Sequence, residues 1–382
     1  MQIIFKTTHC NKYSLNSLAR AIEDFEGNIF FERDIGKILK IIDENSLIVF
    51  SFMNMNSKKE LSDAKRIKEI YPRSKIIAGG VYFTKESEEG LDLFDSVFIG
   101  EGEETFRDFL YGRKKEKIIK PTKEVDINKF GSVSDKFKRF GSIEISRGCH
   151  YGCFYCQTPQ IFGNKMRHKT VDKIIEEVEI LLRNNFRDIR FITPDLASYA
   201  SDKKGEINIK EIKRLFNALS QIIKNRGRIF LGSFPSEIRP ENITEDLAYE
   251  LKKITSSKRV IIGAQSGSQD ILKKINRAHS VDDILNAVKI LSSFGFNVDV
   301  DFIFGFPFET EKDFKETKKV IDILVRLYKA RIHIHYFMPL PSTPFENLKP
   351  KPLSREIKNY LSGLISSKDA YGQWEKQIAQ SI

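Results

Sequence analysis

The chain has 382 residues, of which 41% are hydrophobic and 11% aromatic, so it can bury a core of two domains and a short tail. No apolar run reaches transmembrane length, which excludes a membrane-spanning protein and favours a cytoplasmic one. The net charge of +11 is spread over mixed stretches such as Lys58-Lys59-Glu60. Dispersed charge favours a solvated basic surface over a nucleic-acid site, although nucleic acid is not excluded.

Residues 1–118 alternate short apolar runs with amphipathic stretches, which is the pattern of a parallel sheet covered by helices. Apolar spacings of three and four predict helices at Lys58–Ile70 and Glu103–Leu110. The predicted strands are Ile3–Lys6, Ile29–Phe31, Leu47–Phe52, Lys75–Ala78 and Ser96–Ile99. This first segment is therefore predicted to form a Rossmann-like α/β domain.

Several unusual residues follow the last three of these strands, at the edge where parallel sheets bind ligands. Glycines there let a ligand approach the backbone, although each one taken singly is also typical of an ordinary tight turn. The candidate residues are Ser51, Met53, Asn54, Gly79, Gly80, Gly100 and Glu101.

A charged segment begins near residue 111, carries Pro121 and lacks sustained apolar periodicity. We place the interdomain linker at residues 119–140.

Strand–helix alternation restarts in the second domain, which we place at residues 141–345. Helix-like sequence such as Val171–Asn184 and Val281–Phe294 follows each strand except the last. The predicted strands are Ser142–Ser146, Asp188–Thr193, Arg228–Ser233, Arg259–Gly263, Val298–Ile303 and Arg331–Phe337. Six such units suit a partial (β/α)6 TIM-type barrel, whose site would lie at the carboxyl ends of the strands. Residues 346–382 are predicted to form a short helical tail.

Three of the four cysteines, Cys149, Cys153 and Cys156, lie in one C-x3-C-x2-C run after the first barrel strand. Three thiolates can ligate three irons of a [4Fe–4S] cluster and leave the fourth iron open to another ligand. An odd number of cysteines argues against disulfides, and structural zinc needs a fourth ligand that the adjacent His150 could supply only awkwardly. The run therefore favours a cluster that takes part in chemistry.

This run, with the aromatic Tyr155 just before its last cysteine, resembles the signature of radical S-adenosylmethionine (SAM) enzymes. The resemblance implies that the open iron is chelated by SAM and that Tyr155 lies against the adenine. It also implies an external one-electron reductant of the ferredoxin or flavodoxin type.

Later strand ends resemble the branch of this superfamily that includes oxygen-independent coproporphyrinogen oxidase and the methylthiotransferases. By this resemblance Gln265 contacts the SAM ribose, Arg277 reaches the carboxylate and Asp301 accepts from the ribose. A guanidinium fork suits a carboxylate. Thr193 and Ser233 end the second and third barrel strands and are further SAM-binding candidates.

The three strand-end loops of the first domain, taken together, resemble the cobalamin-binding domain that precedes many radical SAM cores. The loop that supplies a lower histidine ligand to cobalt in cobalamin mutases is absent, because the chain reads Thr7-Thr8-His9-Cys10 after the first strand. Cys10 is expected to be a small buried residue.

Cobalamin beside a radical SAM core implies methyl transfer to an unactivated carbon, by way of a 5′-deoxyadenosyl radical and methylcobalamin. The expected partner is a protein substrate, and the compact archaeal branch that C-methylates a glutamine of methyl-coenzyme M reductase is the nearest resemblance. One alternative is an RNA-modifying methylthiotransferase, but that family carries a second cysteine triad and a β-rich RNA-binding tail. Another is a non-catalytic iron–sulfur protein for electron transfer.

Overall fold

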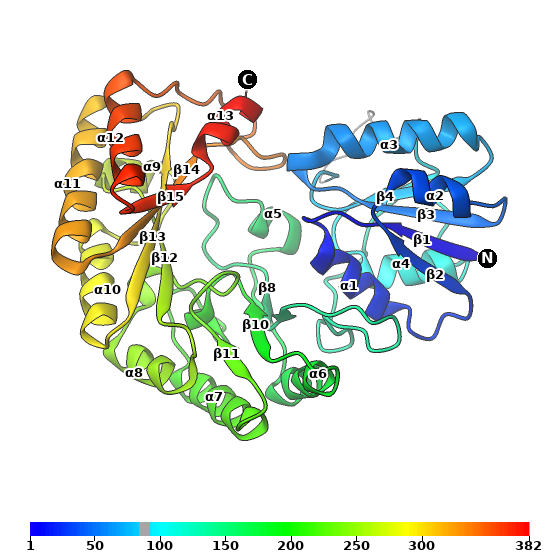
Figure 1. Ribbon diagram of the computed structural model, residues 1–382, viewed down its shortest axis with the longest axis horizontal. Coiled ribbons are helices and arrows are strands. Elements are labelled where there is room, and N and C mark those ends of the chain that lie inside the picture. The colour runs from blue at the N-terminus through cyan, green and yellow to red at the C-terminus, as the bar shows by residue number, and fades with distance from the viewer. Residues whose placement is uncertain (84–91, 382) are drawn as a thin grey trace. The chain divides into compact units, whose positions relative to one another are not determined.

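The computed structural model describes residues 1–83 and 92–381, and its helices and strands form an α/β fold (Figure 1). The chain divides into two compact units, Met1–Ile143 and Glu144–Ile382. In both units, parallel strands are covered by helices. The predicted α/β class is thereby confirmed.

The first unit holds one six-stranded parallel sheet with the strand order β2-β1-β3-β4-β5-β6. All the predicted strands and both predicted helices are present, and two helices that the periodicity did not single out, α1 and α2, are added. The elements are β1 Gln2–Lys6, α1 Lys12–Ala21, β2 Asn28–Glu32, α2 Ile35–Ile41, β3 Ser46–Ser51, α3 Ser57–Ile70, β4 Lys75–Gly79, β5 Ser96–Phe98, α4 Glu103–Leu110 and β6 Ile118–Ile119.

Neighbouring residues of each strand point to opposite faces of this sheet, and helices cover both faces. Ile3 and Phe5 of β1 pack in one cluster with Leu15 of α1 and Phe106 of α4. Ile4 of the same strand packs in a second cluster, with residues of α2 and α3. The continuous apolar run of β1 is thus explained by a helical layer on each face of the sheet.

Residues 119–140, the expected linker, pack against the first unit. The strand β6 at the beginning of this segment pairs with β5 and extends the sheet. Val125 and Ile127 are buried, and the Val125 amide donates to the carboxylate of Glu101 over 2.9 Å. The segment lacks periodicity because single apolar side chains anchor an irregular path, a pattern that spacing rules do not detect.

The second unit alternates strands and helices along nearly its whole length. Its elements are β7 Ile143–Glu144, β8 Ser146–Arg147, α5 Thr158–Phe162, β9 Arg167–His168, α6 Val171–Arg183, β10 Asp188–Ile192, α7 Ile209–Ile223, β11 Arg228–Phe230, α8 Glu245–Ile254, β12 Arg259–Gln265, α9 Gln269–Lys274, α10 Val281–Ser293, β13 Asn297–Phe304, α11 Glu311–Tyr328, β14 Arg331–Tyr336, α12 Arg355–Ser366, β15 Ala370–Gly372 and α13 Trp374–Ser381.

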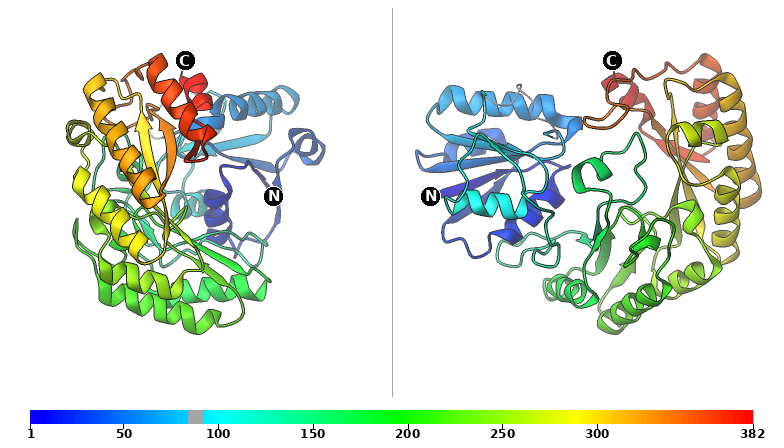
Figure 2. Two further views of the ribbon diagram at one scale, coloured as in Figure 1. Left: turned by 60° about the vertical axis from the view of Figure 1, so that its left-hand side comes forward. Right: turned by 180° about the vertical axis from the view of Figure 1, so that it is seen from behind.

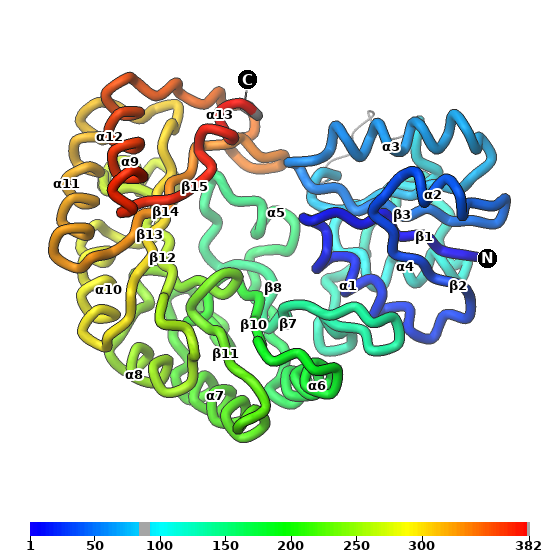
Figure 3. The backbone as a smooth tube through the Cα atoms, viewed as in Figure 1, coloured from blue at the N-terminus to red at the C-terminus, as the bar shows by residue number. Residues whose placement is uncertain are grey.

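The main strands of this unit form two sheets, ordered β11-β10-β7 and β12-β13-β14-β15. The amide of Ile261 in β12 donates to the carbonyl of Gly232 over 2.7 Å and so joins the two. The strands follow one another in a curved row in Figure 3, and the green, yellow and orange helices cover their outer side in Figure 2. The carboxyl ends of the strands therefore meet at one rim.

The tail departs from its prediction, because it carries a strand as well as helices. Residues 370–372 form β15, which pairs in parallel with β14. A three-residue strand has too few residues to show alternation, and only the exposed edge of β14 gives it a partner. The tail also carries two helices, α12 and α13, as expected.

Helix starts in this unit follow local rules. Thr310 and Asp313 form a reciprocal capping box at the start of α11, and Ser280 and Asp283 do so for α10. The first of these caps starts α11 just after the loop that leaves β13. Within the described residues, no helix is both long and apolar enough to cross a bilayer.

We predict that Gly80→Ala destabilises the protein whereas Gly363→Ala does not. Gly80 has a φ of +99°, and an added Cβ would overlap the backbone of Phe52, so we expect a loss of at least about 2 kcal/mol. Gly363 lies in α12 with open space around it, and alanine there should add about 0.5–1 kcal/mol. Urea unfolding of the two variants measures both changes. Equal stability of the two variants would contradict the packing described for Gly80.

Candidate active site

The cysteine loop begins at a point of close backbone contact. Gly148 follows β8 with a φ of +85°, and a Cβ there would overlap the carbonyl of Lys165. The next amide, of Cys149, donates to the Gly163 carbonyl over 3.2 Å. Glycine is therefore required at residue 148 to bring the first cysteine against the following turn.

Side chains and amides from distant parts of the second unit hold the rest of this loop. The side-chain amide of Asn276 donates to the Gly152 carbonyl over 2.8 Å, and the Phe154 amide donates to Ile275 over 3.1 Å. The side chain of Gln157 donates to the carbonyl of Pro341 over 2.9 Å. The loop that carries the cysteines is consequently fixed at both of its ends.

The three thiols occupy different electrostatic environments. Burial raises the pKa of Cys149 to about 11 and also raises the pKa of Cys156. Burial acts in the same direction on Cys153, but the charges of Arg277 and Arg239 outweigh it and lower the pKa of this thiol. Their guanidinium Nη1 atoms lie 3.6 and 3.7 Å from its sulfur. Cys153 is therefore the thiol that is most readily deprotonated for metal binding.

Sequence reasoning missed Arg239, which follows the cis-proline turn after β11. Its guanidinium lies 3.5 Å from the ring centre of Tyr151 and pairs with Glu241 over 2.7 Å. Burial opposes the charge of Glu241, yet the bond to His279 and the charge of Arg239 lower its pKa to about 2. Arg239 matches none of the patterns used above, and only the fold brings it to the cysteines.

His150 does not complete a zinc site in this arrangement. Its Nδ1 lies 3.1 Å from the carbonyl oxygen of Asn164 and its Nε2 lies 3.2 Å from that of Ser201. Both ring nitrogens thus face backbone acceptors, which leaves three thiols as the donor set of the loop. Three soft ligands without a fourth suit an iron–sulfur cluster better than structural zinc. Cys10 belongs to the first unit and is exposed, contrary to the expectation that it is buried.

Tyr155, Gln265 and Arg277, three of the predicted SAM-binding residues, lie together. Arg277 donates to the Tyr155 hydroxyl over 3.3 Å and to the Gly263 carbonyl. A Cβ on Gly263 would lie 2.6 Å from the side-chain nitrogen of Gln265, so the glycine leaves room for that side chain. Gln265 itself has a φ of +71° at a bulge in β12. Backbone strain of this kind is typical of functional sites.

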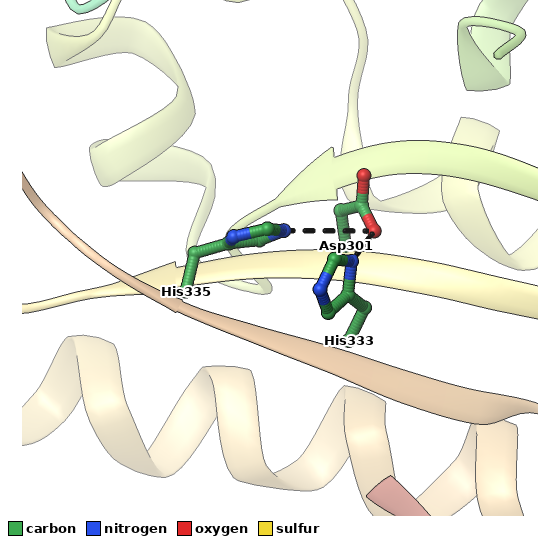
Figure 4. Close-up of side chains that lie close together, drawn as sticks. All are labelled: Asp301, His333 and His335. Atoms are coloured by element: carbon green, nitrogen blue, oxygen red, sulfur yellow. Dashed lines mark hydrogen bonds and ion pairs between the residues drawn. The ribbon is translucent and has the colours of Figure 1, made fainter. Parts of the chain in front are cut away.

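The other predicted SAM-binding residues are more dispersed. Thr193 is buried, its amide donates to Pro235 over 3.2 Å and its hydroxyl donates to Asp195 over 3.0 Å. Asp301 pairs with His333, which the sequence did not single out (Figure 4). Burial and the neighbouring carboxylate of Asp301 raise the pKa of Glu237 to about 8. Glu237 is a further polar residue at this rim that the motifs did not identify.

The polar atoms around the cysteines fit an anionic ligand group such as the carboxylate of SAM. Among the described residues, Arg239 Nη2 and Arg277 Nε, on the two arginines beside Cys153, are buried donors without a hydrogen-bond partner. Ser233 Oγ, after β11, is a further buried donor without one. Buried donors are nearly always satisfied in folded proteins, so a ligand or water is expected to complete them.

In the first unit, the predicted cobalamin-binding residues lie at the carboxyl edge of the sheet. This sheet reverses its strand order between β1 and β3, where open α/β sheets bind ligands. Ser51 donates to or accepts from Ser14 over 2.9 Å, and Glu101 accepts from the amide of Val125. Met53 and Asn54 are partly exposed.

The three predicted glycines at this edge pack against the protein's own atoms. A Cβ on Gly79 would lie 3.3 Å from Phe98, and one on Gly100 would lie 3.4 Å from Pro121. Gly80 abuts Phe52 as described above. Internal packing therefore explains these glycines. A ligand is favoured by the place of this edge, where the strand order reverses, rather than by the glycines.

The contrast between the thiols gives a prediction for the cluster-free protein. Alkylation of Cys153 by iodoacetamide should reach half its maximal rate at a lower pH than alkylation of Cys149, for which that pH should lie near 11. Arg239→Gln should move the Cys153 profile to higher pH, because one positive charge is lost. Arg226→Gln, at an exposed arginine that pairs with Glu179, serves as the control. Mass spectrometry of the cysteine peptides measures each profile, and superimposable profiles for Cys153 and Cys149 would contradict the assignment.

The part of the chain that carries the cysteine loop is similar to known proteins. Residues 143–321 match the model of the radical SAM superfamily. A tRNA-2-methylthio-N(6)-dimethylallyladenosine synthase of Clostridium tetani is 31% identical over 202 residues, which cover 52% of this chain and 43% of that relative. The chain spans less than two thirds of the length of the first curated relatives that it matches.

Two solved structures resemble the chain over most of its length. One is the radical SAM methyltransferase TsrM of Kitasatospora setae with cobalamin and a [4Fe–4S] cluster bound, with a TM-score of 0.68 and 15% identity over 90% of this chain and 73% of that one. The other is the cobalamin-dependent radical enzyme OxsB with aqua-cobalamin bound, with a TM-score of 0.67 and 16% identity over 90% of this chain and 54% of that one. At such identities the likeness shows the fold alone. Residues 143–321, which contain the cysteine loop, are thus similar to the radical SAM superfamily, whose model they match.

Proposed function

We propose that the protein is a cobalamin-dependent radical SAM C-methyltransferase that methylates an unactivated carbon. A radical SAM domain implies a [4Fe–4S] cluster and SAM as cofactors. The observation that carries the proposal is the combination of this domain with a parallel sheet of order β2-β1-β3-β4-β5-β6 in the preceding unit. The likeness to the fold of two cobalamin-containing radical SAM proteins over 90% of the chain supports it.

In this proposal, Cys149, Cys153 and Cys156 hold the cluster. When bound, the cofactors supply a 5′-deoxyadenosyl radical and a methyl group. Arg277, with its unpartnered Nε, binds the SAM carboxylate, and Tyr155 lies against the adenine. Gln265, held over Gly263 by its bulge, and one oxygen of Asp301 receive the ribose hydroxyls. The protein thereby binds and orients the groups that react.

Ser233 and Thr193 complete the proposed SAM site. The unpartnered hydroxyl of Ser233 offers one further donor. Because the Thr193 amide and hydroxyl are both engaged within the protein, this residue contributes through its backbone carbonyl. The carboxyl edge of the first unit, with Ser51, Met53, Asn54, Gly79, Gly80, Gly100 and Glu101, is the proposed cobalamin site.

We further propose a protein side chain as the methyl acceptor and a ferredoxin- or flavodoxin-like donor of single electrons. A glutamine of methyl-coenzyme M reductase is the first acceptor to test. Both proposals follow from the resemblance given by the cysteine run and the strand-end loops.

The second candidate is a methylthiotransferase, since the curated relatives include tRNA-2-methylthio-N(6)-dimethylallyladenosine synthases. The first unit counts against it, because Cys10 is the only cysteine among residues 1–143 and cannot form a second triad. We therefore rank this candidate below C-methylation.

The radical chemistry has a direct test. Protein reconstituted without oxygen should hold about four irons per chain and should release 5′-deoxyadenosine when SAM and a reductant are added. Cys153→Ala should lose both, while Cys10→Ala, at an exposed cysteine of the first unit, should keep both. Iron analysis and chromatography of the nucleoside measure the outcomes. A Cys153→Ala protein that retained its iron and its activity would refute the cluster assignment.

Two tryptophan substitutions, one at each edge of the sheet in the first unit, test the cobalamin proposal separately. Asn54→Trp, after β3, should weaken the binding of hydroxocobalamin at least about tenfold by filling the proposed site. Asn45→Trp, an exposed residue just before β3 at the opposite edge, should not. Titration followed by the visible spectrum of cobalamin measures both affinities.

Mass spectrometry of candidate substrates from a deletion strain tests which group the protein transfers. Loss of the mass of one methyl group would support methyl transfer, and loss of a methylthio group would support the second candidate instead. Wild-type protein that bound no cobalamin would overturn the methyltransferase proposal.

A further inference from the structure

Strand β14 places two histidines on the inner face of the second sheet. Ile332, Ile334 and Tyr336 are buried on one side of this strand, and the alternating residues Arg331, His333 and His335 face the other side, where they are partly exposed. A spacing of two residues on a strand puts both imidazoles on the same face.

The neighbouring strand supplies a carboxylate to this pair. Asp301 of β13 lies opposite His333 in the parallel register. Its Oδ1 is 3.0 Å from Nδ1 of His333 and 3.8 Å from Nε2 of His335, while its other oxygen points away from both rings (Figure 4). One oxygen and two ring nitrogens thus converge, all within 4.8 Å of one another.

We propose that Asp301, His333 and His335 bind one divalent transition-metal ion of the zinc type, separate from the cysteine cluster. Zinc bonds of about 2.0–2.1 Å in a tetrahedral site place neighbouring ligand atoms about 3.4 Å apart. The observed separations of 3.0 and 3.8 Å lie on either side of that value. Small movements of the two rings therefore suffice to admit the ion.

The ligand chemistry selects the class of ion. Two imidazoles and one carboxylate suit zinc and related transition ions, whereas calcium and magnesium prefer sites made of oxygen. The side chain of Asp301 is 10% exposed and those of both histidines are 29% exposed, so the site is accessible from the inner face of the sheet. Three protein ligands leave a fourth position for an oxygen or nitrogen of a substrate.

Residues around the proposed metal site hold His333 in place, as the outer partners of metal ligands commonly do. The ring of Tyr371 stacks on His333 with centroids 4.3 Å apart and an interplanar angle of 4°. Its hydroxyl donates to Asp299 over 3.1 Å, and Arg331 pairs with the same carboxylate over 2.9 Å. The site is thus built on three adjacent strands rather than on a loop.

The free oxygen of Asp301 makes this site compatible with a ribose contact. Gly263, beneath the side chain of Gln265, lies opposite Asp301 in the register of β12 and β13. A substrate atom on the metal would consequently lie on the same face of the sheet as the proposed SAM residues. The metal site itself rests on the three ligands and does not depend on the proposed methyl transfer.

The test is zinc binding by the untagged full-length protein with its cluster reconstituted, so that the three cysteines are occupied. Equilibrium dialysis against zinc, followed by elemental analysis of zinc and iron, should give one zinc per chain. His335→Ala should weaken zinc binding at least about tenfold with iron content unchanged. His9→Ala, at an exposed histidine of the first unit, should bind zinc like the wild type.

Asp301→Asn provides a second variant that keeps the size of the side chain, and it should also lose zinc. Circular dichroism confirms that each variant is folded. Wild-type protein that retains no zinc, or His335→Ala and Asp301→Asn proteins that bind it as tightly as wild type, would overturn the proposal. Because the readout is metal content, failure of the methyltransferase proposal leaves this result unaffected.

Discussion

Two guanidinium groups that converge on one buried thiol are the interaction around which the second unit is organised. Burial alone would raise the pKa of the Cys153 thiol, and the charges of Arg277 and Arg239 lower it instead. The arginines come from separate segments, one after β11 and one after α9. They meet only because parallel strands direct their carboxyl ends to one rim. The chemistry of the cysteine loop therefore depends on the closure of the strands around it.

The residues that hold the cysteine loop also meet at this rim. Arg277 binds the backbone of Gly263 and the hydroxyl of Tyr155, and Arg239 lies over Tyr151. Each arginine thus holds part of the cysteine loop in place and also brings a positive charge close to Cys153. A basic side chain that both shapes a loop and tunes a thiol cannot be exchanged for lysine without loss, because lysine lacks the planar fork.

The inner face of the second sheet carries several charged side chains. Asp299 of β13 is paired with Arg331 of β14, Asp301 is paired with the two histidines of β14, and Glu237 adds a further acid. Charges buried in this way are costly unless they are paired, and they are retained where they bind ligands. The residues proposed to bind the metal ion lie on this face, whereas the apolar sides of the same strands pack under the helices.

The amino-acid sequence determined the class of the fold and the main strands, and it supplied the proposed cluster ligands. Periodicity identifies an element from its own residues, and three cysteines in one short run are close in space whatever the rest of the chain does. Gln265 and Arg277 could be predicted as a pair for the same reason, since they lie 12 positions apart in one strand–helix unit.

Tertiary structure alone decided the remainder. Arg239 lies 86 residues from Cys153, and Asp301 lies 32 residues from His333, so no local pattern links either pair. The short strand β15 and the packed segment 119–140 likewise depend on edges and surfaces that exist only after folding. Local sequence specifies which residues alternate or coil, but strand register and the meeting of strand ends specify which side chains touch.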